Sequence, residues 1–315
     1  MRAFLSFLLV LLAGHAIAQG YPSRPVRVLV GFTPGGGTDI NARLLAPKLA
    51  EYLGQQFVVE NRPGAATNLA TEVVAKSPAD GYTLLFTTSA LAINASLYKN
   101  LRYDAQRDLA PVSVLCQSPN LLVAGPGTAA KNIAELVAEA RAKPGALNYS
   151  SAGSGTSQHL AGELFKLRTG INVVHVPFKG TDPSLTAVVA GDVQFSFANI
   201  PAIMAKGGRL RALALAGAQR SALMPDVPTM KEAGVEGVEV SVWYGLLAPA
   251  GTPREVVQAL AGAATRAARS PDLGKRILDK GEEPLGSTPE EFEKQLRADI
   301  ARYAEVVKLS GAKAE

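Results

Sequence analysis

Short apolar runs alternate along the chain with longer segments whose apolar residues recur at helical spacing. One segment, 110–126, reads as two strands interrupted at Ser118-Pro119. The other runs that read as single strands are 26–32, 56–60, 80–88, 171–178, 193–200, 210–217 and 238–249. This alternation predicts an α/β fold with mostly parallel sheets flanked by helices.

Capping residues indicate where the helical segments begin and end. Thr38 is expected to cap the helix after the first glycine-rich loop, and Gly54 is expected to end it. Asp182, which precedes a proline, is the expected N-cap of a later helix. Thr252 and Thr288 each precede a proline and are followed three residues later by a glutamate, which is the pattern of a capping box.

The N-terminal segment has the features of a secretory leader. Arg2 precedes the apolar run 3–13, and the small residues within 16–18 form a cleavage site. The apolar run is shorter than the ~20 residues that a membrane-spanning helix needs. We therefore expect residues 1–18 to be a signal peptide, and the mature chain, starting at Gln19, to be soluble and periplasmic.

Chain length and strand order predict two lobes. Without the leader, 315 − 18 = 297 residues remain, which exceeds the usual size of one domain. We expect lobe 1 to comprise residues 19–123 and 246–315, and lobe 2 to comprise residues 124–245. Strands near 119–124 and 240–247 would form the two crossings of a hinge. The protein is expected to work as a monomer.

Composition and charge exclude several classes of function. The formal net charge of +5 is small and the basic residues are scattered, whereas nucleic-acid binding needs a basic stripe with interleaved aromatic residues. A mildly positive surface still attracts small anions. Cys116 is the only cysteine and is expected to be a small buried residue. Because His159 and His175 lack zinc-ligand spacing, we expect no metal and no cofactor.

The sequence VGFTPGGGTDI, residues 30–40, joins a predicted strand to a predicted helix. It lacks the third glycine of the dinucleotide-binding pattern and the lysine of a Walker loop. Three successive glycines exceed the need of a tight turn and indicate close approach of the backbone to a ligand. Helix starts of this kind bind anions through their free N–H groups. The candidate ligand-binding residues here are Phe32, Thr33, Gly36, Gly37, Thr38 and Asp39.

A second strand-loop-helix segment, SSAGSGTSQH at residues 150–159, repeats this arrangement. Its candidate ligand-binding residues are Ser154, Gly155, Thr156 and Ser157. The glycine of a serine-hydrolase elbow is missing, because Ala152 stands two residues before Ser154. Facing each other across a cleft, the two loops would clamp a small anion such as a carboxylate. Without a base, nucleophile or metal in view, no catalytic residue is expected.

Polar residues at the ends of other strands extend the predicted site. Thr88 and Ser89 follow the third strand, and Asn199 ends a strand in the second half of the chain. Ligands of α/β proteins bind at such carboxyl ends. Asp39 either caps its own helix or holds an ammonium group or a water molecule near the ligand. Tyr244 either packs in the hinge or forms the floor of the cleft.

Over nearly the whole mature chain, the sequence resembles the Bug-type extracytoplasmic solute-binding proteins of tripartite tricarboxylate transporters. The resemblance rests on the segments YPSRPVRVLVGFTPGGGTDINAR, VVENRPGA, ADGYTLLFTTSALAINASLYKNLRYDAQRDLAPVS, LNYSSAGSGTSQHLAGELF, VHVPFKGTDPSLTAVVAGDVQFSF and WYGLLAPAGTP. It implies a two-lobed type II periplasmic-binding-protein fold, with a Venus-flytrap cleft that binds a di- or tricarboxylate, an acidic amino acid or an aromatic acid. It also implies that the first loop holds a carboxylate, partly through ordered waters. The residues that it carries over are Phe32, Gly36, Gly37, Thr38 and Asp39 in one lobe, and Ser154, Thr156 and Ser157 in the other.

One segment departs from the family pattern. The family's loop after the second strand usually reads Pro-Gly-Ala-Gly-Gly, whereas this chain has Pro63-Gly64-Ala65-Ala66-Thr67. The added side chains either narrow the site or contribute the Thr67 hydroxyl to it, so Thr67 is also a candidate ligand-binding residue.

Three functions agree with these features. In the first, the protein captures a small organic acid and delivers it to a membrane permease. In the second, a ligand sensor presents the bound acid to a histidine kinase. The third is an enzyme in which His159 and Ser154 act as base and nucleophile.

Overall fold

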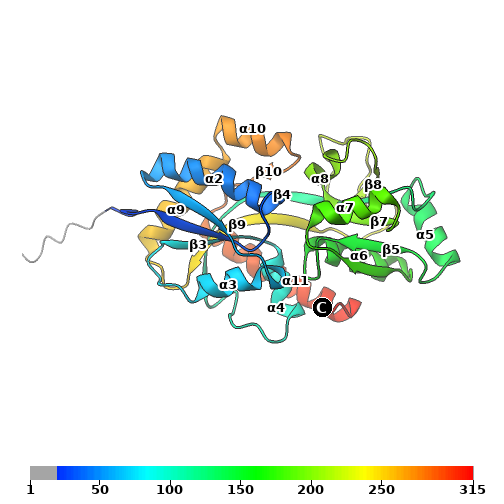
Figure 1. Ribbon diagram of the computed structural model, residues 1–315, viewed down its shortest axis with the longest axis horizontal. Helices are drawn as coiled ribbons and strands as arrows, with labels where there is room; N and C mark the ends of the chain where they lie inside the picture. Colours follow the sequence, from blue (N-terminus) through cyan, green and yellow to red (C-terminus); the bar gives the residue numbers. More distant parts are fainter. Residues whose placement is uncertain (1–19, 315) are drawn as a thin grey trace, which may run out of the picture.

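The computed structural model describes residues 20–314, so the predicted leader lies outside the described residues. Two α/β lobes share one path of strands in the order β2-β1-β3-β9-β4-β7-β5-β6 (Figure 1). β8 and β10 lie off this path and pair with β4. The expected two-lobed fold is confirmed.

The first lobe contains the N-terminal elements, at the left of Figure 1, and the C-terminal helices, of which α11 extends toward the second lobe and packs against α6. β1, β2 and β3 are parallel, and β9 pairs with β3 in the antiparallel direction. Its strands are β1 (Val26–Val30), β2 (Phe57–Asn61), β3 (Thr83–Thr88), β9 (Ser241–Pro249) and β10 (Glu283–Pro284). Its helices are α2 (Gly37–Leu53), η1 (Ala65–Thr67), α3 (Asn68–Ala75), α4 (Ala90–Leu97), α9 (Arg254–Ala268), α10 (Pro271–Asp279) and α11 (Pro289–Ser310).

The second lobe contains the middle of the chain, drawn in green at the right of Figure 1. β5 is parallel to both β6 and β7, whereas β7 and β8 pair with β4 in the antiparallel direction. Its strands are β5 (Asn148–Ser151), β6 (Val174–Pro177), β7 (Phe195–Asn199) and β8 (Arg211–Leu215). Its helices are α5 (Ile133–Ala142), α6 (Ser157–Thr169), α7 (Thr181–Ala190) and α8 (Ile200–Met204).

β4 (Leu109–Ala124) connects the lobes as one uninterrupted strand. Its residues up to Pro119 pair with β9, and from Asn120 onward it pairs with β7 and β8. The expected break at Ser118-Pro119 was therefore wrong. The proline is tolerated because it lies at the end of the ladder with β9, where the strand exchanges its partners.

Three groups of buried side chains stabilise the fold. One core lies between the sheet and α3, α4, α5, α6 and α11, and it runs without a break through both lobes. On the opposite face there are two cores, one under α2, α9 and α10 and the other under α7 and α8. The lobes are therefore joined on one face and separate on the other. No helix among residues 20–314 is long and apolar enough to cross a membrane.

The capping signals were partly correct. Gly54 ends α2 in the left-handed conformation, and Thr288 forms the expected capping box of α11. Thr38 was wrong as a cap because α2 begins at Gly37, with Gly36 as N-cap, two residues before the predicted cap. Asp182 was wrong because Gly180 is the N-cap of α7. The box at Thr252 does not form, because its hydroxyl donates to the Pro249 carbonyl and Pro253 is the N-cap of α9.

Candidate functional site

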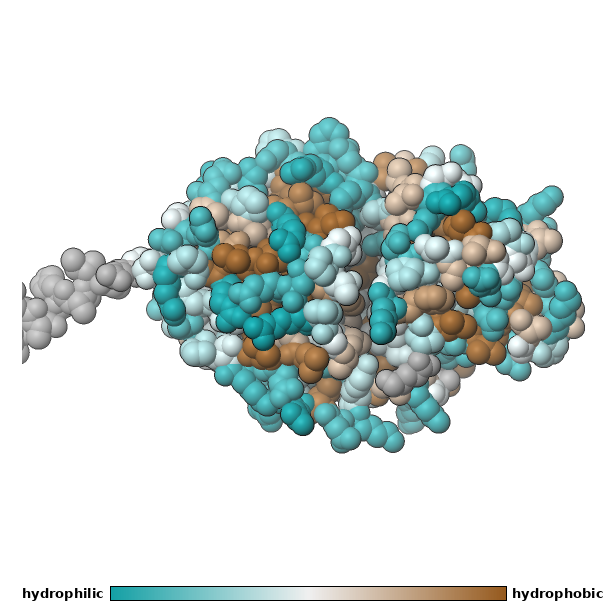
Figure 2. All heavy atoms as spheres, in the orientation of Figure 1, coloured by the Kyte–Doolittle hydropathy of each residue, from teal (hydrophilic) through white to brown (hydrophobic). Residues whose placement is uncertain are grey.

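A cavity of about 90 Å³ lies between the two lobes, at the carboxyl ends of the parallel strands. Figure 2 shows the surface hollowed by a furrow between the two halves of the molecule. The first lobe contributes Phe32, Thr33, Gly36, Gly37, Thr38 and Thr88, together with Val242 and Tyr244 of β9. The second lobe contributes Ala152, Thr156, Ser157, Gln158, Gly180, Thr181 and Asn199. These lining residues include no charged side chain.

Three helices begin at the cavity wall. The N-caps are Gly36 for α2, Thr156 for α6 and Gly180 for α7. Each helix N-terminus carries free N–H groups and about half a positive elementary charge. An anion in the cavity would therefore meet N–H donors from both lobes, although no lysine or arginine lines the cavity.

The lobes meet at Gly37, Asn199 and Tyr244. The Asn199 amide nitrogen donates to the Tyr244 hydroxyl at 3.1 Å, and a Cβ added to Gly37 would lie 3.0 Å from that hydroxyl. Burial, followed by the nearby Glu282 and Cys116, raises the pKa of Tyr244 well above its ordinary value. The neutral hydroxyl thus accepts from Asn199 and keeps its own proton to donate to a ligand.

Asn199 also carries a buried oxygen, Oδ1, without a hydrogen-bond partner in the described part of the chain. Buried polar groups are nearly always paired, so a ligand in the cavity is the natural partner. Because a half-turn exchanges the oxygen and nitrogen of a carboxamide, the same position can also offer N–H groups to a carboxylate.

Asp39 is buried behind the first glycine-rich loop and holds its shape. Its carboxylate accepts from the Gly35 N–H, from Arg43 Nε and from Asn61 Nδ2, each at 2.9 Å. Burial alone would raise the pKa of Asp39, but these three donors together hold it below its ordinary value. Asn61 also donates to the Phe32 carbonyl at 3.0 Å. Asp39 therefore supports the loop and lies outside the cavity wall.

Gln158 connects the helix starts of the second lobe. Its Oε1 accepts from the Ala152 N–H at 2.7 Å, and its Nε2 donates to Thr181 Oγ1 at 2.9 Å. Thr156 caps α6 by accepting from the His159 N–H at 3.3 Å. The bond from Gln158 to Thr181 thus fixes the starts of α6 and α7 relative to each other.

Four further predicted residues lie beside the cavity and not in its wall. Ser89, Ser154 and Thr67 have buried hydroxyls without a partner among the described residues. Gly155 packs against α4 of the first lobe, where an added Cβ would lie 2.4 Å from Asn94 Oδ1. The expected residues that do line the cavity are Phe32, Thr33, Gly36, Gly37, Thr38, Thr88, Thr156, Ser157 and Asn199.

The segment that departs from the family pattern has an unusual backbone. Ala65, Ala66 and Thr67 have positive φ angles of 44°, 49° and 80°. This left-handed region favours glycine, which is the residue that the family pattern provides at two of these positions. Thr67 also lies directly against Gly31, where an added Cβ would meet Thr67 Cβ at 2.6 Å. Its side chain therefore fills space behind the first loop.

Five residues that line the cavity were not predicted from the sequence: Ala152, Gln158, Gly180, Thr181 and Val242. A signal for two of them was present, because Gly180-Thr181 follows β6 as a third strand-glycine-helix junction. Because a proline follows Asp182, Asp182 was predicted as the N-cap of this helix. The N-cap in the structure is Gly180, two residues earlier.

The described hydrogen bonds do not join His159 and Ser154, the two residues of the possible catalytic pair. His159 Nδ1 accepts from the Gly155 N–H at 3.2 Å, and Ser154 Oγ has no partner among the described residues. A serine–histidine contact does exist between Ser151 and His175, at 2.7 Å, but Ser151 is fully buried. Residues 20–314 contain no group of three or more His, Cys, Asp or Glu side chains that could hold a metal ion.

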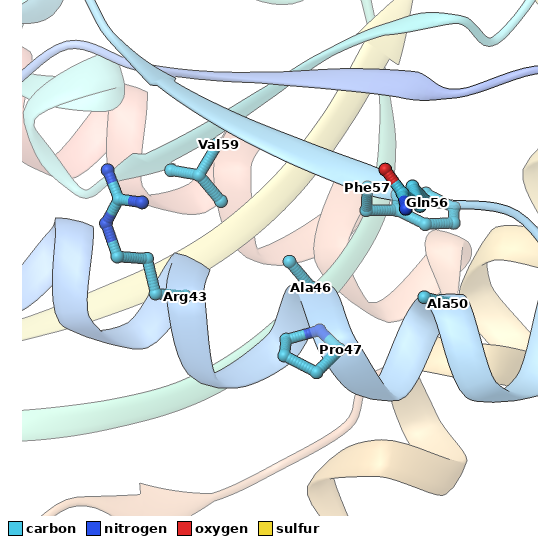
Figure 3. A pocket seen from close by; sticks show the side chains of 7 residues that line it. All are labelled: Arg43, Ala46, Pro47, Ala50, Gln56, Phe57 and Val59. Atoms are coloured by element: carbon cyan, nitrogen blue, oxygen red, sulfur yellow. The ribbon is translucent and has the colours of Figure 1, made fainter.

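A larger groove of about 370 Å³ lies between α2 and β2, away from the helix starts (Figure 3). Arg43 is the only charged residue of its lining, and its guanidinium already binds Asp39 and Asn61. The remaining lining residues are Ala46, Pro47, Ala50, Gln56, Phe57 and Val59. None of the described helices begins at this groove, whereas three helices from both lobes begin at the cavity between the lobes, which is therefore the candidate site.

Two α/β lobes joined by crossing strands, with a polar cavity between them, define a type II periplasmic-binding-protein fold. A family described as tripartite tricarboxylate transporter family receptor matches residues 41–311, and the chain belongs to this family. The resemblance found in the sequence is thus confirmed.

The chain is similar to protein BugT of Bordetella pertussis, with 37% identity over 306 residues, covering 96% of this chain and 94% of BugT. Among solved structures, it is similar to R. palustris Rpa4515 with adipate, with 37% identity and a TM-score of 0.88. That match covers 94% of this chain and 100% of the other. MatC (Rpa3494) from Rhodopseudomonas palustris with bound malate is 33% identical, with a TM-score of 0.85, covering 91% and 100%.

Proposed function

We propose that the protein is a periplasmic solute-binding protein that captures a small carboxylate between its lobes. The observation that carries this proposal is the convergence of three helix N-termini, from both lobes, on a small cavity without charged side chains. Such a cavity holds an anion through N–H and hydroxyl donors. Two similar proteins have adipate and malate bound, which supports a carboxylate as the ligand.

The volume of the cavity narrows the class of ligand. Pockets for drug-sized molecules measure ~300–1,000 Å³. At about 90 Å³, this cavity favours a small acid over a ligand the size of a nucleotide. The apolar surfaces of Phe32 and Val242 would cover the carbon chain of such an acid.

We propose ligand contacts for the residues that line the cavity. The carboxylate would accept hydrogen bonds from N–H groups at Gly37 and Thr38 of α2, and at Ser157 of α6. The hydroxyls of Thr156 and Tyr244 lie in the same wall. Asp39, Thr67 and Gly155 would support the site from outside the wall, and Ser89 and Ser154 also lie outside it.

Binding would close the lobes around the hinge strands β4 and β9. The predicted lobe boundaries, at 123/124 and 245/246, stay a prediction. The exchange of partners within β4 supports a crossing a few residues earlier, near Pro119. We propose that the closed form then delivers the unchanged acid to a membrane transporter, as the receptor description of the family suggests.

A thermal-shift screen tests the proposed function. The panel contains mono-, di- and tricarboxylates, acidic amino acids and aromatic acids, with phosphate and sugars as controls and adipamide as the uncharged match of adipate. Ligand at ~100 times its dissociation constant stabilises a protein by about 2.7 kcal/mol. For a protein of this size, this stabilisation raises the melting temperature by several degrees. We expect a shift with one class of carboxylate and none with adipamide. Shifts with phosphate or sugars alone would contradict the proposal.

A further inference from the structure

Two stacked imidazoles lie beneath the second glycine-rich loop. His159 of α6 and His175 of β6 have ring centroids 4.1 Å apart and planes inclined by 14°. His159 Nδ1 accepts from the Gly155 N–H at 3.2 Å. His175 Nε2 bonds to Ser151 Oγ at 2.7 Å, and this oxygen accepts from the Gly153 N–H at 3.1 Å. The two histidines therefore hold both glycines of the loop.

These glycines set the direction of the loop. Gly153 and Gly155 have positive φ angles of 129° and 83°, which other residues rarely adopt. Thr156, the N-cap of α6, follows at once, and its hydroxyl donates to the Gly153 carbonyl at 2.8 Å. The position of Thr156 and of the first N–H groups of α6 in the cavity wall thus depends on the bonds to the histidines.

These bonds require an uncharged His159. A ring nitrogen that accepts a hydrogen bond carries no proton, so His159 must hold its proton on Nε2. Protonation at Nδ1 would place two donors, this nitrogen and the Gly155 N–H, against each other. A second charge on His175 would add repulsion between stacked rings 4.1 Å apart.

The groups around the pair also favour the neutral form. Burial chiefly lowers the pKa of His159 to about 4, with Lys166 adding to the effect and Glu163 opposing it. Burial, then His159 and Lys166, lowers the pKa of His175 to about 3. Glu163 is itself bonded to Lys166 at 2.8 Å and to the Tyr149 hydroxyl at 2.6 Å.

The neighbouring elements add no further charge that acts on the pair. Tyr149 of β5 stacks on His175 with centroids 4.8 Å apart, and burial raises its pKa well above the ordinary value. Phe195 of β7 stacks on Tyr149 in turn. On α11, which also packs against α6, burial raises the pKa of Tyr303 to about 12, so this group is neutral as well.

We propose that His159 and His175 are positioning residues of the ligand site, and that the second loop captures its ligand only while His159 is uncharged. The inference rests on the proposed function. If it is correct, ligand binding weakens at low pH because the protein itself is protonated, in addition to any protonation of the ligand.

Stability sets the range in which binding can be measured. In the folded protein the pKa values of His159 and His175 lie below the ordinary 6.5. Below pH 6.5 the unfolded chain therefore binds more protons at these histidines than the folded chain does. The free energy of unfolding therefore falls as the pH drops from 6.5 toward 4 and then 3. Urea unfolding at each pH identifies the conditions in which the protein is still folded.

The test compares calorimetric affinities for adipate and malate, from pH 7 downward, in the wild type and two variants. His159→Leu removes the acceptor, and we expect at least a ~10-fold loss of affinity at pH 7, the equivalent of one hydrogen bond. His159→Asn places an oxygen near the Nδ1 position without a titrating group and should restore most of this loss. At pH 4 about half of the His159 rings are protonated, so the wild type should lose about twofold more affinity than His159→Asn, and roughly 10-fold more at pH 3. Ligand protonation affects both proteins equally.

Superimposable pH profiles, or no loss in His159→Leu, would overturn the proposal. A second readout needs no ligand, because NMR follows the His159 ring and the Gly155 amide of the free protein. We expect both signals to titrate together, and an unmoved Gly155 amide would overturn the inference even if adipate binds. If the amide moves but no acid binds, the proposed function and the binding part of the inference fail while the loop contact stands.

Discussion

The three successive positions of the first loop differ in how strongly, and why, they require glycine. Gly35 has a φ of 82°, a backbone conformation that glycine adopts without strain and other residues rarely adopt. Gly36 has extended backbone, and an added Cβ would meet only the Thr33 carbonyl, at an ordinary 3.6 Å. At Gly37 the same atom would lie 3.0 Å from the Tyr244 hydroxyl. The feature that makes Gly37 necessary is thus a neighbour from a distant strand.

Gly37→Ala should weaken ligand binding by at least ~10-fold. The methyl group either displaces the Tyr244 hydroxyl from Asn199 or occupies the cavity, and overpacking of this kind costs about 1–3 kcal/mol. Calorimetry with the acid that shifts the melting temperature measures the loss. Gly36→Ala, whose methyl group has room, is the matched comparison and should lose much less affinity. Equal losses in both variants would contradict the role of Gly37.

The residue types of the site were easier to predict from the sequence than their positions. The glycines and hydroxyl residues after β1 and β5 were predicted, because a glycine-rich turn before a helix has a known chemistry. Gln158 and Val242 were missed because neither belongs to such a pattern. Asp39 was predicted as a helix cap or a ligand contact, yet its carboxylate binds the Gly35 N–H, Arg43 and Asn61, and it is not part of the cavity wall.

Among the elements, β9 links the cavity to the opposite side of the sheet. Side chains alternate along a strand, so Val242 and Tyr244 line the cavity while Trp243 points the other way. Trp243 packs edge-on against Phe292 of α11, and its Nε1 donates to Asp299 at 2.9 Å. Movement of the hinge would therefore change the surroundings of this indole.

Ligand binding should change the intrinsic fluorescence of Trp243, the only tryptophan of the chain. The indole has no contact with the cavity, so the change would report the twist of β9 on closure. A fluorescence titration should give the same dissociation constant as calorimetry. Trp243→Phe controls for tyrosine emission and should abolish the signal. Unchanged emission at a ligand concentration that calorimetry shows to be saturating would place the hinge elsewhere.

Element boundaries were predicted well where the signal was local. The capping box of Thr288 formed because both of its partners lie within one turn of α11. The equivalent sequence at Thr252 did not form a box, because the Pro249 carbonyl at the end of β9 competes for the hydroxyl. β4 crosses Pro119 as one strand because two different partners support its two halves. Such competition between distant groups is not visible in a single sequence.

For the whole molecule, the arrangement of the three cores explains how a cavity between lobes can open and close. One core is continuous through both lobes and includes α11, which packs against both α4 and α6. The two cores on the other face are separate, so the lobes can approach each other there. The fold class followed from the alternation of strands and helices. A cleft between the two glycine-rich loops was also predicted, but its full wall was not, because the wall combines segments from Phe32 to Tyr244.

The most direct test of this account is a crystal structure with the acid that stabilises the protein most. We predict that a carboxylate lies between the lobes, with its oxygens ~3 Å from N–H groups at the starts of α2 and α6 and no charged side chain in contact. An acid bound in the groove between α2 and β2, or one in the cavity with its carboxylate held by a lysine or arginine, would contradict the account.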